Sequence, residues 1–160
     1  MLSDDEILGT ARWIAAHQHA SGEIYWWEGD KADPWNHTHA AMAMLLADLR
    51  DEADTAYRFL ADTQAVNGGW AMERRDGRAV DESQDSNQAA YIATGAWFHF
   101  AATGDRRFLE ELWPTVERAI NFVADMQDES GAIVEVAPAN RPQIRMVVIL
   151  EPAPVAKRKK

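Results

Sequence analysis

Apolar residues recur at helical spacing in three segments of the chain, residues 3–18, 51–64 and 105–127. In each segment a stripe of apolar side chains lies opposite a charged face, which is the pattern of an amphipathic helix. The segments between them, residues 34–49 and 87–103, are apolar on nearly every face and are expected to be buried on most sides. We therefore predict an all-α fold in which outer amphipathic helices alternate with inner buried ones, with no sheet in the first 133 residues.

Helix-boundary signals agree with this division. A short polar side chain at a helix start can accept hydrogen bonds from backbone N–H groups that lack a helical partner. The expected capping signals are Ser3 with Glu6, Asp33 before Pro34, Asp85 or Ser86, and Asp105 after Gly104. The apolar stripes of the first and last helices should bury Ile7 and Ile120. Pro114 should kink or restart the last helix, because proline lacks a backbone donor.

A turn of the form Gln-x-x-x-Gly, with a bulky apolar residue two places further on, ends each amphipathic segment. The three copies are Gln18–Gly22–Ile24, Gln64–Gly68–Trp70 and Gln127–Gly131–Ile133. The first two copies lead through a polar loop into an inner helix. A recurring helix pair that cannot bury its apolar face alone indicates a repeat architecture.

The charge of the chain is unevenly distributed. The formal net charge of the 160 residues is −10, but residues 134–160 hold six basic and two acidic residues, about +4, so residues 1–133 carry about −14. Four prolines in residues 134–160 exclude a long helix there. We therefore predict a helical domain at residues 1–133 and an irregular basic tail at residues 134–160. The acidic body argues against nucleic-acid binding, which requires a basic face.

Other compositional features narrow the functional classes. The chain has no cysteine, which excludes disulfides and cysteine-based zinc sites. No apolar stretch reaches the roughly 20 residues of a membrane-spanning helix. The acidic first residues do not resemble a secretion signal, so a cytoplasmic location is the expectation.

The loops that lead from outer to inner helices, residues 21–33 and 65–82, should lie at the same end of the molecule, which we call the inner-helix pole. These loops and the inner-helix starts concentrate tryptophans, amides and carboxylates. The candidate ligand-binding residues are Trp26, Trp27, Trp35, Asn36, Trp70, Asn87 and Tyr91, with His39 one turn into the first inner helix. Flat aromatic rings beside polar groups suit a sugar, because a pyranose has an apolar face and a polar rim.

Three carboxylates at this pole are candidates for catalysis. Asp33 and Asp85 occupy equivalent positions in the two repeats, and Glu73 is a loop alternative. Glycoside hydrolysis commonly uses two carboxylates, one as the acid and one as base or nucleophile. The alternative is that both aspartates only cap their helices and that Glu73 is a solvated charge. Likewise, at least one of Trp26 and Trp27 is expected to pack on the protein rather than on a ligand.

The histidines do not form a clear metal motif. His37 and His39, like His17 and His19, are two residues apart, and side chains at that spacing on a helix point in different directions. His99 lies in an apolar helix and is expected in the core. We therefore predict no metal site and no cofactor.

Several stretches resemble the (α/α) toroid proteins. They are residues 33–44 (DPWNHTHAAMAM), residues 85–123 (DSNQAAYIATGAWFHFAATGDRRFLEELWPTVERAINFV) and the Gln-x-x-x-Gly turns. Two groups share that shape, the six-hairpin glycosidases and the toroids of terpenoid cyclases and prenyltransferases, and the likeness is strongest to bacterial toroid proteins labelled prenyltransferase. The resemblance covers roughly residues 5–133 and implies the first half of a toroid. The Asp-x-Asp-Asp motif of squalene-hopene-type cyclases is absent, and so is an Asp, Cys and His zinc set.

Three functions follow as competing hypotheses. The favoured one is a carbohydrate-active toroid fragment that binds or hydrolyses a glycoside at the inner-helix pole. The second is a toroid acting on an isoprenoid, which the turn motif favours and the missing acid and zinc motifs disfavour. The third is a catalytically inactive half-toroid that self-associates or pairs with a complementary half, since an incomplete ring leaves apolar surface uncovered.

Overall fold

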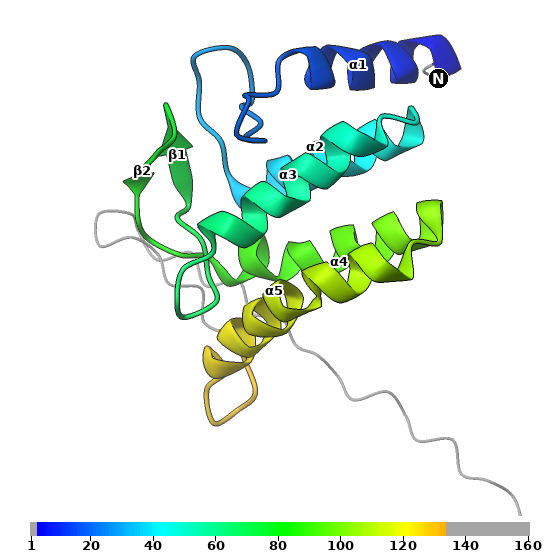
Figure 1. Ribbon diagram of the computed structural model, residues 1–160. Coiled ribbons are helices and arrows are strands. Elements are labelled where there is room, and N and C mark those ends of the chain that lie inside the picture. Colours follow the sequence, from blue (N-terminus) through cyan, green and yellow to red (C-terminus); the bar gives the residue numbers. More distant parts are fainter. Residues whose placement is uncertain (1–2, 134–160) are drawn as a thin grey trace, which may run out of the picture.

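The computed structural model describes residues 3–133, and the predicted tail at residues 134–160 lies outside the described residues. The described chain forms five helices and a short hairpin (Figure 1). The helices are α1 (Asp4–Ala16), α2 (Pro34–Leu46), α3 (Arg50–Thr63), α4 (Ser86–Thr103) and α5 (Arg106–Asp125). Helices α2 and α4 pack on each other, α1 and α3 pack on α2, and α5 packs on α4 and α3. The predicted all-α class, with alternating outer and inner helices, is confirmed.

The predicted helix starts are also confirmed. Ser3 and Glu6 form a reciprocal capping box at α1. Asp33 accepts from the backbone N–H of Asn36 at the start of α2, and Asp85 is the cap of α4. Gly104 ends α4 in a left-handed conformation, and Asp105 then caps α5.

The prediction that the first 133 residues contain no sheet is wrong. Strands β1 (Glu73–Arg75) and β2 (Arg78–Asp81) form an antiparallel hairpin within the loop before α4. Its two turn residues, Asp76 and Gly77, both have positive φ angles, of 47° and 74°. An Asp-Gly pair is the preferred sequence for such a two-residue turn, so the local signal was present in the sequence.

Two expectations about the outer helices, a break at Pro114 and the burial of Ile120 and Ile7, are not met. Helix α5 runs without a break through Pro114, so the helix does not restart there. Pro114 and Glu110 are both exposed, so the carbonyl of Glu110 that loses its helical partner can be hydrated. Ile120 is 43% exposed and Ile7 of α1 is 40% exposed, contrary to the expected burial of both. The helical period placed these residues on the correct stripe, but no neighbouring element covers them within the described residues.

The Gln-x-x-x-Gly turns join successive outer helices. The side-chain amide of Gln18 donates to the carbonyl of Gly22 in its own turn (3.0 Å) and to that of Glu52 in α3 (3.1 Å). Gln64 repeats both bonds, to Gly68 (2.8 Å) and to Thr115 in α5 (3.0 Å). The repeat therefore has a structural basis, because the glutamine of each of the first two turns fastens the next outer helix to the turn.

Candidate functional site

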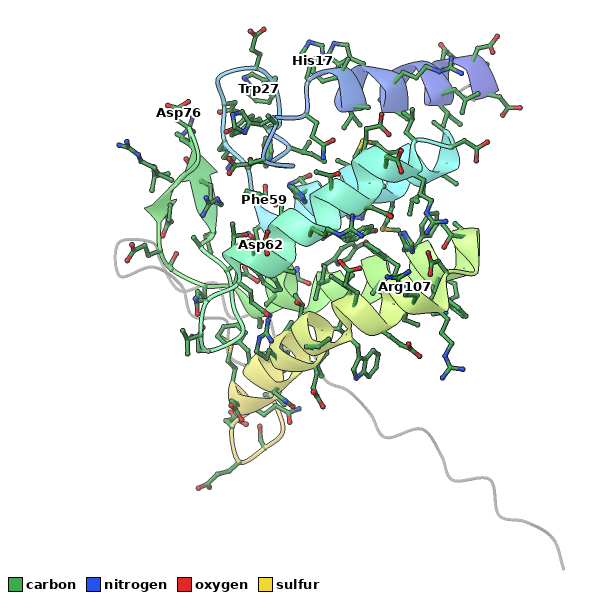
Figure 2. The ribbon with its side chains drawn as sticks, viewed as in Figure 1. His17, Trp27, Phe59, Asp62, Asp76 and Arg107 are labelled. Atoms are coloured by element: carbon green, nitrogen blue, oxygen red, sulfur yellow. The ribbon has the colours of Figure 1, made fainter. Side chains whose placement is uncertain are left out.

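The two outer-to-inner loops lie at the same end of the molecule, as the repeat predicts. Figure 1 shows the loop before α2 and the β1–β2 hairpin on one side of the helices. Side chains of the hairpin tip and of the α2 loop point outward at this end, and Asp76 and Trp27 mark them in Figure 2. The backbone of Arg74 in β1 exchanges two 2.9 Å hydrogen bonds with Ala32, the residue before Asp33. The hairpin is thus attached directly to the start of α2.

Asp33 lies at the centre of a polar network at the inner-helix pole. Its carboxylate accepts from the backbone N–H of Asn36 (2.8 Å) and from the side-chain amide of Asn36 (2.9 Å). The indole N–H of Trp26 donates to Oδ2 (2.5 Å), the same oxygen that accepts from the Asn36 side-chain amide. The side chain is only 6% exposed. Asp33 therefore caps α2 and also holds two of the predicted ligand-binding residues.

Asp85 has the equivalent position at the start of α4. Its Oδ1 atom accepts from the backbone N–H groups of Asn87 (2.7 Å) and Gln88 (3.1 Å), and the residue is 8% exposed. Asn87 is exposed beside it. The side-chain oxygen of Gln88 is buried without a hydrogen-bond partner in the described structure, which is a feature that the sequence did not suggest. A buried acceptor of this kind calls for a water molecule or a ligand donor.

Glu73 differs from the two aspartates because its carboxylate is engaged by cations. Arg75 Nε lies 2.7 Å from it and Lys31 Nζ lies 3.9 Å away. Lys31 also lies over the ring of Trp26, 4.2 Å from its centroid. Glu73 therefore links the hairpin to the loop before α2 through ion pairs. It is not simply a solvated charge, which was the alternative expected from the sequence.

Most of the predicted aromatic residues do gather on an exposed surface. The ring centroids of Trp35 and Tyr91 are 6.0 Å apart, and those of His39 and Tyr91 are 4.4 Å apart. The Tyr91 hydroxyl and His39 Nε2 form a 2.6 Å hydrogen bond that joins α2 to α4. Trp26 and Trp27 meet edge to face, and Trp27 is 59% exposed. These side chains form an aromatic platform at the starts of the two inner helices.

Trp70 is a correction to the predicted site. It is only 4% exposed, and its indole N–H donates to the carbonyl of Leu60 at 2.8 Å. Ile24, the equivalent residue of the first turn, is also buried. In the first two turns, the bulky residue after the turn glycine therefore points into the core between the helices. Trp70 therefore anchors the fold and presents no face to a ligand.

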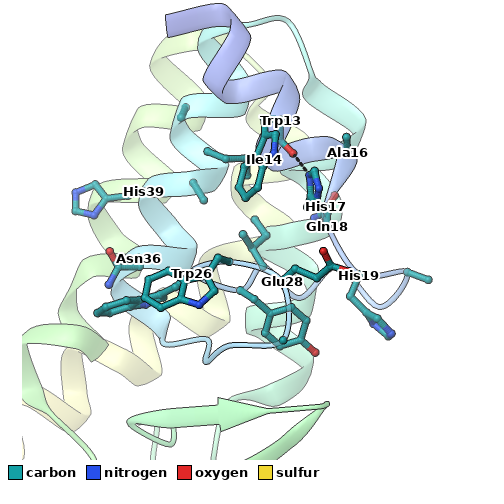
Figure 3. Close-up of a pocket in the computed structure, with 17 residues that line it drawn as sticks. Trp13, Ile14, Ala16, His17, Gln18, His19, Trp26, Glu28, Asn36 and His39 are labelled. Atoms are coloured by element: carbon teal, nitrogen blue, oxygen red, sulfur yellow. Dashed lines mark hydrogen bonds between the residues drawn. The ribbon is translucent and has the colours of Figure 1, made fainter. Parts of the chain in front are cut away.

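A cavity of about 810 Å³ lies beside the platform, between α1, the loop before α2, and α2 itself (Figure 3). Trp26, Trp27 and Asn36 line it, as does His39. Its other wall comes from residues of α1 and its end that the sequence did not indicate, Trp13 and His17. Their rings stack 4.2 Å apart. The sequence missed them because the helical pattern placed them on the outer helix, away from the pole loops.

Buried polar groups support the loop that carries Trp26 and Trp27. Glu23 is fully buried and pairs with Arg74 Nε (2.9 Å) and with the Tyr25 hydroxyl (2.8 Å). Burial, with the nearby Glu23 carboxylate, raises the pKa of Tyr25 to about 12. His37 holds the same loop by accepting from the backbone N–H of Ile24 (3.3 Å). Burial lowers the pKa of His37 to about 4, so this histidine is neutral at pH 7.

Neither pair of histidines forms a metal site. His37 and His39 point to different surroundings, one buried and one exposed. Within residues 3–133, no three side chains of His, Cys, Asp or Glu group closely enough to hold a metal ion. His99 is a core residue, as predicted, and is bonded to Asp54 at 2.7 Å. No helix between residues 3 and 133 has the length and apolar character needed to cross a membrane.

Comparison with known proteins points to carbohydrates. No protein-family model matches the chain. Over 133 residues the chain is 44% identical to an MMP endo-(1,4)-3-O-methyl-alpha-D-mannosidase of Mycolicibacterium hassiacum, a match that covers 83% of this chain and 37% of that protein. Over 87 residues it is 26% identical to an uncharacterized glycosyl hydrolase of Methanocaldococcus jannaschii, covering 54% of this chain and 14% of that protein.

The names of these relatives bear on the two resemblances drawn from the sequence. Both are named as glycosidases, which supports a glycoside-acting function at a coarse level and is consistent with the glycosidase branch of the toroids. Neither name supports the prenyltransferase likeness. The chain spans little more than a third of the length of the mannosidase that it matches.

Proposed function

We propose that this chain binds an oligosaccharide at the inner-helix pole and contributes carboxylates to the hydrolysis of a glycosidic bond. The observation that carries the proposal is the cavity of about 810 Å³ lined by Trp13, Trp26 and Trp27 beside the Asp33 network. Its volume lies in the upper part of the usual range for ligand sites, roughly 300–1,000 Å³, and suits more than one sugar ring.

The lining of the cavity favours a sugar that carries apolar groups. Indole rings from three positions offer flat apolar surface, and Asn36 and His39 offer hydrogen-bonding groups at its edge. The mannosidase relative is named for a 3-O-methyl mannoside, and an O-methyl group extends the apolar face of the sugar. We therefore propose an α-(1→4)-linked 3-O-methylmannose oligosaccharide as the ligand class.

Asp33 and Asp85 are the proposed catalytic carboxylates. Both lie at inner-helix N-termini, beside the predicted ligand-binding residues Asn36 and Asn87. Hydrolysis needs a general acid at the leaving oxygen and a base or nucleophile at the anomeric carbon. Glu73 is the less favoured candidate because Arg75 and Lys31 already engage its carboxylate.

Ligand binding can be tested by tryptophan fluorescence. A methylated mannose oligosaccharide should change the emission of the full chain, and Trp27→Ala should weaken the response because this exposed indole lines the cavity. Trp97→Ala is the matched control, since Trp97 is also exposed (67%) but lies on α4 outside the cavity. Equal loss in both variants, or a response to prenyl diphosphates alone, would overturn the proposal.

The catalytic role can be separated from capping with amide variants. Asparagine caps helices nearly as well as aspartate, so Asp33→Asn and Asp85→Asn should keep the fold. If the carboxylates transfer protons or attack the sugar, turnover should fall at least about a hundredfold while oligosaccharide binding persists. Retained turnover in either variant would show that the substituted aspartate only caps its helix.

A further inference from the structure

The first two turns dock the following outer helix through positions that are equivalent in sequence. The carbonyls that accept from Gln18 and Gln64 belong to Glu52 and Thr115. Glu52 lies twelve residues before the glutamine of its own helix, Gln64, and Thr115 lies twelve residues before Gln127. The same docking interface therefore occurs twice within this chain.

The turn glycines make the second contact of this interface. A Cβ atom at either glycine would lie within about 3.2 Å of the docked helix. The contacts are Gly22 with Thr55 and Phe59, and Gly68 with Arg118 and Phe122. Thr55 and Arg118 both lie nine residues before the glutamine of their helix, and Phe59 and Phe122 both lie five residues before it. A docked helix thus presents three groups at fixed spacing. They are a backbone carbonyl that accepts from the turn glutamine, a second backbone carbonyl next to the turn glycine, and an aromatic residue.

The third turn has the same shape but holds no helix among residues 3–133. Gln127 donates to the carbonyl of Gly131 in its own turn at 3.3 Å, which repeats the first of the two bonds. The second bond, to a carbonyl of a following outer helix, has no counterpart in the described part of the chain. A Cβ atom at Gly131 would meet nothing within 4 Å. Among residues 3–133, the seat for an outer helix is therefore present and unfilled.

Helix α1 carries the matching pattern and is not docked on any turn in the described structure. Counting back from Gln18, the equivalent positions are Glu6, Gly9 and Trp13. Trp13 is 47% exposed and Gly9 has open space around it, whereas Phe59, the equivalent of Trp13 in α3, is 8% exposed.

The stripe of α1 that contains Glu6, Gly9 and Trp13 corresponds to the stripe that α3 and α5 present to a turn. Ile7 lies on a different side of α1, because side chains two positions apart on a helix point in different directions. Its equivalents are Ala53 in α3 and Val116 in α5. Ile7 is 40% exposed, but Ala53 is fully buried and Val116 is 5% exposed, so a second side of α1 is also uncovered among the described residues.

We propose that this chain self-associates head to tail, with α1 of one copy docked on the Gln127–Gly131 turn of the next. Gln127 donates to the carbonyl of Glu6, and Gly131 packs against the backbone of α1 at Gly9, as Gly22 and Gly68 pack against the carbonyls of Thr55 and Arg118. The Thr10 hydroxyl, which donates to the Glu6 carbonyl at 2.9 Å in the single chain, rotates away on docking. The contact joins two different surfaces, α1 of one copy and the third turn of the next, so each copy can bind two others. Repetition of the contact therefore produces a closed ring or an open chain of copies.

Charge sets the salt dependence of this contact. The first turn of α1 carries Asp4, Asp5 and Glu6, and the third turn carries the acidic residues Asp128 and Glu129. Like charges repel across the contact, and salt screens that repulsion. Association should therefore strengthen as ionic strength rises, which is the reverse of an assembly held by opposite charges.

Sedimentation velocity of the full chain over a micromolar concentration range tests the proposal. The wild-type chain should show species larger than a monomer that increase with concentration and with salt. Gly131→Ala should abolish them, because at the equivalent Gly68 a Cβ atom would lie 2.2 Å from the carbonyl oxygen of Arg118 in the docked helix. Gln127→Ala should weaken them at least about tenfold by removing the docking amide. Ala16→Gln is the matched control, since Ala16 and its equivalents Asp62 and Asp125 are exposed.

A variant of α1 makes the test specific. Trp13→Ala removes the aromatic contact that corresponds to Phe59 and should weaken association, but it keeps the third turn intact, whereas Gly131→Ala keeps α1 intact. An equimolar mixture of these two variants should therefore form one-to-one dimers more strongly than either variant self-associates. A wild-type chain that stays monomeric at every concentration would overturn the proposal, as would association unaffected by Gly131→Ala. Circular dichroism of each variant should confirm the same helical content.

Discussion

The indole nitrogen of Trp26 lies 2.5 Å from Oδ2 of Asp33, so an aromatic wall of the cavity is bonded to the cap of α2. The two residues come from opposite ends of one loop, seven positions apart. Through this bond the orientation of a ligand-facing indole depends on the same carboxylate that is proposed to act in catalysis. The proposed function therefore couples ligand binding to chemistry at Asp33.

Replacing Trp26 by phenylalanine should measure that coupling. The ring surface is largely kept, but the donor to Asp33 is lost, which should lower the free energy of unfolding by roughly 1.5–3 kcal/mol if the bond to the charged carboxylate contributes as such bonds usually do. Trp27→Phe should change stability by less than about 0.5 kcal/mol because Trp27 is 59% exposed. Urea denaturation of both variants provides the measurement, and equal effects would contradict the role of the bond.

His37 should make the fold sensitive to acid. Its pKa is lowered by burial to about 4, whereas an unfolded histidine has a pKa of about 6.5. The unfolded state therefore takes up a proton at a higher pH than the folded state. The contribution of neutral His37 is fully present above about pH 6.5 and declines by roughly 3 kcal/mol in total as the pH falls to about 4.

Urea unfolding measured at several pH values between 7 and 4 would check this dependence. The expected slope should diminish in His37→Gln, although that variant should also be less stable at pH 7 because the bonds to Ile24 and Ala56 are disturbed. His19→Gln is a control in which an exposed histidine is removed. An unchanged pH slope in His37→Gln would assign the acid sensitivity to other groups.

Gly68 and Gly131 occupy the same position in two turns but should respond differently to alanine. Both have positive φ angles, 96° and 83°, so each substitution introduces backbone strain of about 1–2 kcal/mol. At Gly68 the new Cβ would also lie 2.2 Å from the carbonyl oxygen of Arg118, which forces α5 away from the turn. Gly68→Ala should therefore cost at least about 2 kcal/mol more than Gly131→Ala in thermal or urea unfolding. Equal costs would show that the turn is not pressed against α5.

Gln64 and Gln127, the glutamines of the same two turns, should also differ in how much their substitution lowers stability. The amide of Gln64 bonds to Gly68 and Thr115, and its oxygen accepts from Arg118 Nε at 2.8 Å. Gln64→Leu should destabilise the chain by about 2 kcal/mol, because three partners lose their bonds in a partly buried site. Gln127→Leu, which breaks one bond of an exposed turn, should be within about 0.5 kcal/mol of wild type under monomeric conditions. Denaturation curves at low protein concentration would compare them.

The sequence by itself determined the local architecture of this protein. The helical period located five helices, and capping side chains such as Asp33 and Asp85 marked their starts, because caps and periodicity act over a single turn of backbone. The Gln-x-x-x-Gly repeat identified the paired organisation, which in turn placed the loops with Trp26 and Trp27 at one pole. The Asp76–Gly77 hairpin is equally local, because an Asp-Gly pair is by itself the preferred sequence for its two-residue turn.

Only the tertiary structure decided which of these residues face a ligand. Trp70 and Trp27 both occur in pole loops, yet one bonds to Leu60 in the core and the other remains 59% exposed. The cavity wall formed by Trp13 depends on how α1 packs on α2. The exposure of a side chain is fixed by elements distant in sequence, so periodicity can name the face of a helix but cannot tell whether a neighbour covers it.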